Sequence, residues 1–168
     1  MKKFRYKLIL VVAMMLVITT VLAACGGGPI PMPVPKVKGV EIYDIEGSCE
    51  LTRSGDTFEV TGDTNIASGA VLYISLHAQS GMELDAVKIT KTEDAVSQTF
   101  QITDEKYDDS VAQVYAYITC APTLYGKHAE SIYDKYGDDF ENTEADEDNV
   151  IWNNDGIIFV FASDPIDM

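Results

Sequence analysis

Acidic side chains crowd the segment from residue 138 to residue 148, where seven carboxylates fall within eleven residues and no lysine or arginine separates them. Calcium takes about six to eight oxygen ligands, so closely spaced carboxylates lower the cost of assembling them. The candidate calcium ligands, in an irregular site unlike an EF-hand, are Asp138, Asp139, Glu141, Asp146, Asp148 and Asp155. Two other interpretations stay open: a solvated loop, because like charges repel, and a docking patch for a cationic protein.

Two of the three cysteines, Cys49 and Cys120, alternate with apolar residues in candidate strands. We therefore expect both thiols on inward faces, and the favoured hypothesis is a disulfide between them. It would close a loop of about 70 residues and add roughly 4 kcal/mol in the chain-entropy model. The alternative is two free, buried thiols that act as small hydrophobic groups. A catalytic cysteine needs a neighbouring base and an exposed site, and the sequence indicates neither.

Tyrosines occupy alternate positions of two further candidate strands. Tyr73 lies on one strand, and Tyr115 and Tyr117 lie on the other. An exposed aromatic strip of this kind could stack on a sugar or a peptide. The alternative is that these rings pack against a helix predicted over residues 127–136.

The chain contains two histidines, His77 and His128. His77 falls on the less apolar face of its strand, and His128 falls on the polar side of the predicted helix, so both are expected at the surface. The sequence contains no GxSxG, HExxH, P-loop, GxGxxG or CxxC motif. It therefore does not indicate an enzyme.

The first 24 residues have the layout of an export signal. A cationic stretch from Met1 to Lys7 precedes an uncharged apolar run of 17 residues from Leu8 to Ala24, which is short for a membrane-spanning helix. The run leads into Leu22-Ala23-Ala24-Cys25-Gly26, which resembles the lipobox of bacterial lipoproteins. The resemblance implies cleavage before Cys25, a diacylglyceryl group on its thiol and attachment to the outer side of the cell membrane, as in a Gram-positive envelope. An uncleaved transmembrane anchor is the alternative.

Residues 25–39 are expected to form a tether, because glycines follow Cys25 and alternating prolines favour polyproline II. Residues 40–168 remain for one domain. The chain has 12 Lys and Arg against 27 Asp and Glu, and residues 1–24 hold four of the basic residues and none of the acidic ones. The mature chain therefore has 8 against 27, a net charge of −19. This charge argues against nucleic-acid binding and against electrostatic docking on anionic lipid.

Apolar residues recur with a period of two from about residue 45 onward, in seven short segments separated by turn residues. The predicted strands are 45–51, 57–61, 70–78, 84–90 with a bulge between Ala86 and Val87, 96–102, 113–120 and 157–162. One segment has helical spacing instead, at Ala129, Ile132, Tyr133 and Tyr136. It predicts the helix over 127–136, which Gly137 is well placed to end.

These segments predict a mainly β fold, an antiparallel sandwich of about seven strands with one short helix inserted before the last strand. The layout resembles the immunoglobulin-like domains of many small bacterial surface lipoproteins. The leading functional hypothesis is a lipid-anchored, non-enzymatic binding or scaffolding module at the cell envelope. The first alternative is a calcium-dependent module for a wall polymer or glycan that uses residues 138–155. The second is an accessory subunit of an envelope hydrolase.

Overall fold

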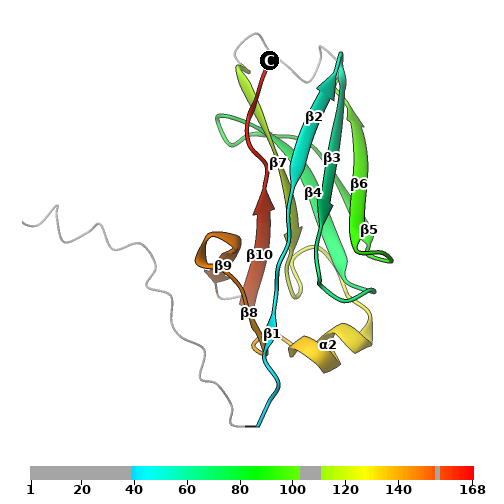
Figure 1. Ribbon diagram of the computed structural model, residues 1–168, viewed down its shortest axis with the longest axis vertical. Helices are drawn as coiled ribbons and strands as arrows, with labels where there is room; N and C mark the ends of the chain where they lie inside the picture. The colour runs from blue at the N-terminus through cyan, green and yellow to red at the C-terminus, as the bar shows by residue number, and fades with distance from the viewer. Residues whose placement is uncertain (1–38, 103–110, 154–155) are drawn as a thin grey trace, which may run out of the picture. The chain divides into compact units, whose positions relative to one another are not determined.

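The computed structural model of the protein describes residues 39–102, 111–153 and 156–168 (Figure 1). The chain divides into two compact units, residues 1–33 and 34–168, and every described residue belongs to the second. The predicted export signal, Cys25 and nearly all of the tether therefore lie outside the described residues, as does Asp155. No helix in the described part of the chain is long and apolar enough to cross a membrane.

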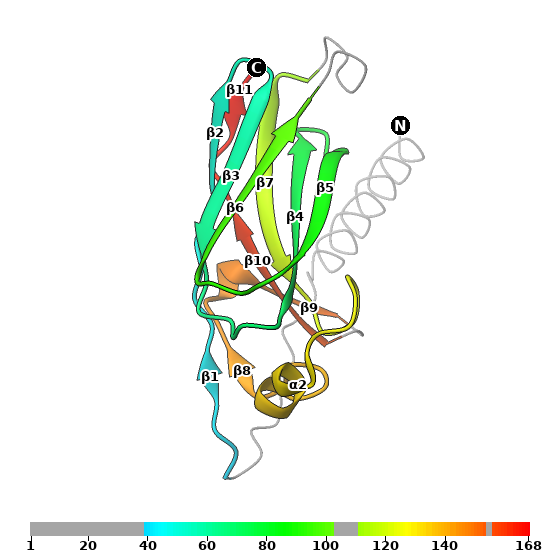
Figure 2. The same cartoon turned by 90° about the vertical axis from the view of Figure 1, so that its right-hand side faces the viewer.

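Two antiparallel sheets pack face to face in the second unit (Figure 2). The larger sheet has the strand order β5-β4-β7-β10-β9, with β11 also paired to β7, and the smaller sheet has the order β2-β3-β6. The larger sheet consists of β4 (Val71–Ala78), β5 (Glu83–Thr90), β7 (Gln113–Cys120), β9 (Val150–Asn153), β10 (Gly156–Ala162) and β11 (Ile166–Asp167). The smaller sheet consists of β2 (Glu50–Ser54), β3 (Thr57–Asp63) and β6 (Ala95–Gln101). The predicted fold class, a mainly β antiparallel sandwich with one short α-helix, is confirmed.

Strict alternation of side chains places the core between the sheets. In β4, Leu72 and Ile74 are fully buried, whereas Tyr73 lies on the opposite face and is half-buried. Phe58 of β3 and Phe100 of β6 belong to the same apolar cluster from the side of the smaller sheet. Each such side chain contributes about 1.5–3 kcal/mol when it leaves water. The period of two in the sequence therefore reflects one buried face on each sheet.

The bulge predicted in strand 84–90 exists, but it lies two residues earlier than expected. Leu76 pairs with Asp85 and His77 pairs with Glu83, so Leu84 is the extra residue of β5. Leu84 and Val87 both pack toward the core, and the change of phase must fall between them. Alanine occurs on buried and exposed faces alike, so Ala86 does not show where the alternation changes. The bulge was therefore predicted too late in the strand.

One end of the sandwich carries α2 (Glu130–Tyr136), β1 (Tyr43–Asp44) and β8 (Thr143–Glu144), as both views show (Figures 1 and 2). β1 and β8 form a separate two-stranded parallel sheet. The helix begins three residues later than predicted, because Ala129 is extended and donates its backbone N–H to the Gly69 carbonyl at 3.0 Å. Gly137 ends the helix as predicted, with a φ of 87° and its N–H bonded to the Tyr133 carbonyl.

Four strands and one short turn of 3₁₀ helix were not predicted. They are β1, β8, β9, β11 and η1 (Glu147–Asn149). Three of these strands have only two residues and cannot display a period. β10 is accordingly preceded by β8 and β9 rather than directly by the helix. β11 brings Ile166 opposite Val114 and leaves the C-terminus at the end of the sandwich away from α2 (Figure 1).

Candidate functional site

The tyrosines predicted as an aromatic strip share the outer face of the larger sheet. Cross-strand pairing places His77 opposite Tyr115, and Thr119 opposite Tyr73. Directly opposite side chains in an antiparallel pair lie about 4.5–5.5 Å apart at Cβ, so these rings are neighbours. All of them are half-buried, neither in the core nor fully in solvent. We define the tyrosine face by Tyr73, His77, Tyr115, Tyr117 and Tyr125.

Two partners fix the ring of Tyr73. It stacks on the ring of Tyr125 with centroids 4.3 Å apart and an interplanar angle of 4°, and its hydroxyl donates to Glu83 Oε2 at 2.8 Å. Burial, together with the Glu83 carboxylate, raises the pKa of Tyr73 to about 12, so the hydroxyl stays a proton donor at neutral pH. Sequence reasoning missed both partners, since Tyr125 lies in the loop after β7 and no periodicity links it to β4.

The rings of the tyrosine face do not pack against the helix. Tyr117 contacts the His77 ring edge-on, with centroids 5.1 Å apart. The helix tyrosines make their ring contacts elsewhere: Tyr136 with Tyr43 and Phe140, and Tyr133 with His128. Among the ring contacts of the described residues, none joins α2 to the tyrosine face. The alternative in which the helix covers the strip is therefore not the arrangement found.

Beside these rings, Ser75 and His77 form a hydrogen-bonded pair. Their side chains lie 3.0 Å apart, from Ser75 Oγ to His77 Nε2, and Glu83 Oε2 lies 4.0 Å from the same nitrogen. His77 Nδ1 lies 3.4 Å from the Gly81 carbonyl, which orients the ring. Ser75 is only 2% exposed, so its hydroxyl cannot approach a substrate carbonyl as a nucleophile would. The pair fixes the imidazole at the surface.

The outer faces of the two sheets differ in chemistry. On β4, β5 and β7, the face that carries the tyrosines holds one acidic and one basic residue, Glu83 and Lys88. The outer face of the smaller sheet has no aromatic residue on its three strands. It is made of Glu50, Thr52, Ser54, Thr57, Glu59, Thr61, Asp63, Ala95, Ser97, Thr99 and Gln101. Rings are thus concentrated on one side of the sandwich.

The carboxylates of the acidic run, residues 138–148, do not converge on one point. Phe140 interrupts it: this side chain is 1% exposed, stacks on Phe159, and has a φ of 60° that bulky residues rarely adopt. The Glu141 carboxylate turns back to accept the Asp139 N–H at 3.1 Å. The remaining predicted ligands before residue 150 are exposed: Asp138, Asp139, Asp146 and Asp148. No group of three or more His, Cys, Asp or Glu among the described residues is placed to hold a metal ion. Asp155 lies outside those residues, so the calcium site stays a prediction.

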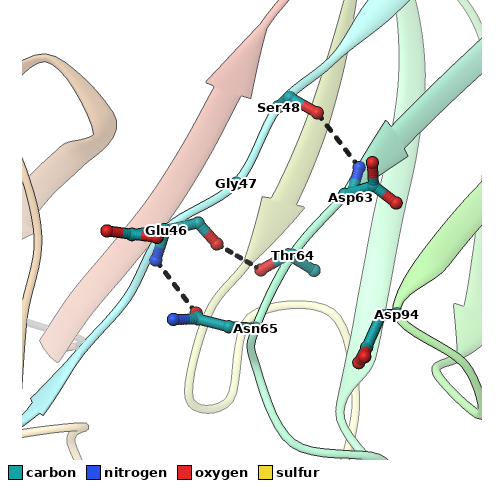
Figure 3. Close-up of a pocket in the computed structure, with 7 residues that line it drawn as sticks. All are labelled: Glu46, Gly47, Ser48, Asp63, Thr64, Asn65 and Asp94. Carbon is teal, nitrogen blue, oxygen red and sulfur yellow. Dashed lines mark hydrogen bonds between the residues drawn. The ribbon is translucent and has the colours of Figure 1, made fainter.

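A hollow that is open to solvent and has a volume of about 500 Å³ lies between the segment before β2 and the end of β3 (Figure 3). Its polar groups are used to join these segments: Thr64 Oγ1 donates to the Glu46 carbonyl at 2.9 Å, and Glu46 N–H donates to Asn65 Oδ1 at 2.9 Å. Asp94 at its edge accepts a hydrogen bond from Lys91, a buried lysine, at 3.0 Å. These hydrogen bonds join neighbouring segments of the fold, so the polar lining of the hollow has a structural role.

No protein family, no curated protein and no solved structure matches this chain. The geometry of the tyrosine face is therefore the main evidence for its function.

The position of His128 corrects the prediction of a surface histidine. Its ring is 4% exposed and both nitrogens are engaged: Nδ1 accepts the Val71 N–H at 2.8 Å, and Nε2 lies 2.7 Å from the Ala121 carbonyl. Burial lowers the pKa of His128, opposed by the carbonyls of Ala121 and Pro122. The residue precedes α2 instead of lying on its polar side, because the helix begins at Glu130.

The two cysteines are inward-facing and buried, as predicted, but both are free thiols, which differs from the disulfide hypothesis. Burial raises the pKa of each thiol to about 12. The Cys49 sulfur is engaged by the backbone of Ile118, which opposes that rise. Each thiol therefore behaves as a small hydrophobic group of the core.

Thiol titration checks this arrangement. We expect no reactive thiol from Cys49 or Cys120 in the folded protein near neutral pH, because the thiolate is the reactive form and both pKa values are about 12. Unfolding in denaturant without reductant should expose both thiols to a chromogenic thiol reagent, and only one in a Cys120→Ala variant. A count of zero in the unfolded, unreduced protein would restore the disulfide.

Proposed function

We propose that this protein is a lipid-anchored binding module on the extracytoplasmic face of the cell membrane, and that the tyrosine face holds its ligand. The resemblance of residues 22–26 to a lipobox supports anchoring through Cys25. Two acyl chains on one cysteine provide stable membrane attachment where a single chain does not. The tether would then present the domain to the envelope beyond the membrane.

The observation that carries the proposal is the contrast between the two outer faces. Tyrosine is enriched at binding surfaces because its ring supplies a large contact area and its hydroxyl supplies a hydrogen bond. The tyrosine face has four tyrosines and His77, all half-buried without serving the core. The outer face of the smaller sheet, where most residues are exposed, has threonines, serines and glutamates instead. Stability alone does not require aromatic residues on only one of these surfaces.

Shielding of Ser75 supports a role in binding rather than in catalysis. A nucleophile needs an exposed oxygen and donors placed to stabilise the developing oxyanion. Ser75 Oγ lies under its neighbours, and its hydrogen bond to His77 holds the ring in place. We therefore assign the histidine to the binding surface, as a polar aromatic contact.

Cosedimentation with envelope fragments tests the proposed function. We expect the full lipidated chain, kept in non-ionic detergent, to sediment with fragments of bacterial envelope. The Tyr73→Ala/Tyr117→Ala double variant should bind at least about tenfold more weakly, because buried aromatic anchors dominate most interfaces. Unchanged binding by this variant would count decisively against the tyrosine face.

The matched control is Thr52→Ala/Thr99→Ala, which alters two exposed positions on the outer face of the smaller sheet. It should bind like the unmodified protein. Circular dichroism confirms that each variant is folded before binding is compared. The assay is run with calcium and with a chelator, and binding that is lost only in the chelator would favour the calcium-dependent alternative instead.

A further inference from the structure

We infer that the ligand of the tyrosine face is an uncharged glycan chain, bound by stacking of its sugar rings on Tyr73, Tyr115 and Tyr117 and by hydrogen bonds to Glu83. This inference rests on the proposed function and specifies its ligand. Charge, the chemistry of the side chains and their arrangement along two strands all point to this ligand.

Charge indicates an uncharged ligand. The chain carries 27 acidic residues against 12 basic ones, yet the outer face of β4, β5, β7 and β11 holds only Glu83, Lys88 and Asp167, so this face is nearly neutral. An anionic polymer would be repelled by the rest of the molecule. A cationic ligand would be drawn to the acidic segment at residues 138–148, which is exposed at most of its carboxylates. A neutral polymer is not repelled by the acidic molecule, and it is not attracted to the acidic segment in preference to this face.

Side-chain chemistry indicates a sugar. A pyranose has an apolar face of C–H bonds that can lie on an aromatic ring, and a rim of hydroxyls that need donors and acceptors. Tyrosine provides both a ring and a hydroxyl. The Glu83 carboxylate accepts one hydrogen bond from Tyr73 at 2.8 Å and has further lone pairs for ligand hydroxyls. The Tyr115 hydroxyl, 3.3 Å from Gln113 Oε1, marks a second polar point on the same face.

The arrangement of the rings indicates a chain rather than a single sugar. Tyr115 and Tyr117 are two residues apart on β7, hence about 7 Å apart along the strand. Tyr73 continues the row from β4, where it lies opposite Thr119. Stacking on Tyr125 and the bond to Glu83 hold the Tyr73 ring in place before any ligand arrives, which reduces the ordering cost of binding.

Depletion by insoluble polysaccharides tests the inference. The probes are chitin and cellulose, which are uncharged, and chitosan, which has the backbone of chitin but carries positive charge. We expect chitin or cellulose to deplete the full chain from solution, with binding retained in high salt because no charge pair is involved. Tyr73→Ala and Tyr117→Ala should each weaken this binding about tenfold. Tyr117→Phe should retain most of it, since the ring is kept, and Thr52→Ala/Thr99→Ala should retain all of it.

Three outcomes would overturn the glycan assignment. The first is that neither chitin nor cellulose depletes the protein, and the second is that only chitosan does. The third is that the tyrosine variants are depleted as strongly as the unmodified protein. If the first occurs while envelope fragments are still bound through the tyrosine face, the glycan fails and the proposed function stands. If the tyrosine variants bind both envelope fragments and polysaccharides normally, both fail together.

Discussion

Replacement of Tyr136 by alanine is expected to lower the free energy of unfolding by about 3–5 kcal/mol, the range for truncating a large buried aromatic side chain. Tyr136 is 1% exposed and lies at the end of α2. Its ring packs edge-on against Tyr43 of β1 and against Phe140, at centroid distances of 5.5 and 5.9 Å. Its hydroxyl accepts the Ala67 N–H at 2.8 Å. One side chain therefore joins the helix, the parallel pair and the loop before β4.

The hydroxyl can be tested separately from the ring. Tyr136→Phe keeps the packing but leaves the Ala67 N–H without its acceptor, so we expect a loss of about 1–3 kcal/mol. Tyr115→Phe is the matched control, because that hydroxyl makes a longer bond, 3.3 Å, to the half-buried side chain of Gln113, and its removal should change stability by less than about 0.5 kcal/mol. Urea unfolding monitored by circular dichroism measures the free energy of unfolding of Tyr136→Ala, Tyr136→Phe and Tyr115→Phe. Equal stability of Tyr136→Phe and the unmodified protein would contradict the assigned hydrogen bond.

Stability should fall as the pH drops below about 6.5, through protonation of His128. Burial lowers the pKa of this histidine in the folded protein below its ordinary value of about 6.5, so the unfolded chain binds the proton more readily. The contribution of His128 to the free energy of unfolding is therefore complete above about pH 6.5, and it is lost as the pH falls through the folded-state pKa. Protonation would also remove the Nδ1 lone pair that accepts the Val71 N–H, while the Nε2 contact to Ala121 would remain.

Variants of the two histidines separate the pH dependence caused by His128 from that of other titratable groups. His128→Gln keeps a donor and an acceptor but cannot titrate, so its stability should change less over this pH range, even if it is lower at every pH. His77→Gln, at the half-buried histidine of the tyrosine face, should keep the original dependence. Urea midpoints at several pH values provide the comparison. A His128→Gln protein with the same slope as the unmodified one would sink the assignment.

The sandwich was predictable because its long strands each bury one face. Leu72, Ile74 and Leu76 are all fully buried, and their spacing of two is visible in the sequence. The short strands were not predictable, since their positions come from tertiary pairing: Tyr43 of β1 forms its backbone bond to Asn142, about 100 residues away. Helical spacing located α2 correctly, but it could not reveal that Ala129 binds the Gly69 carbonyl and delays the helix.

The candidate site was predictable only in part. Tyr73, Tyr115 and Tyr117 were found together because each occupies the non-core phase of a strand. Tyr125 and Glu83 were missed, since stacking and hydrogen bonding between distant segments leave no periodic trace. The acidic run left three interpretations open in the sequence, because spacing alone does not show whether carboxylates converge. In the structure Phe140 is buried in the middle of the run and Asp138, Asp139, Asp146 and Asp148 are exposed, which agrees with the solvated loop, and the calcium site stays a prediction.

The two ends of the described domain have a mechanical consequence. β1 lies beside α2, and β11 lies at the other end of the sandwich (Figures 1 and 2). Tension between a membrane anchor and a load on the C-terminus would pull along both strands. The backbone bonds of Tyr43 and Ile45 to the β8 segment, and of Met168 to Ala112, would then be sheared together instead of opened one by one. This connectivity would let the anchored module that we propose keep its fold under a load along its length.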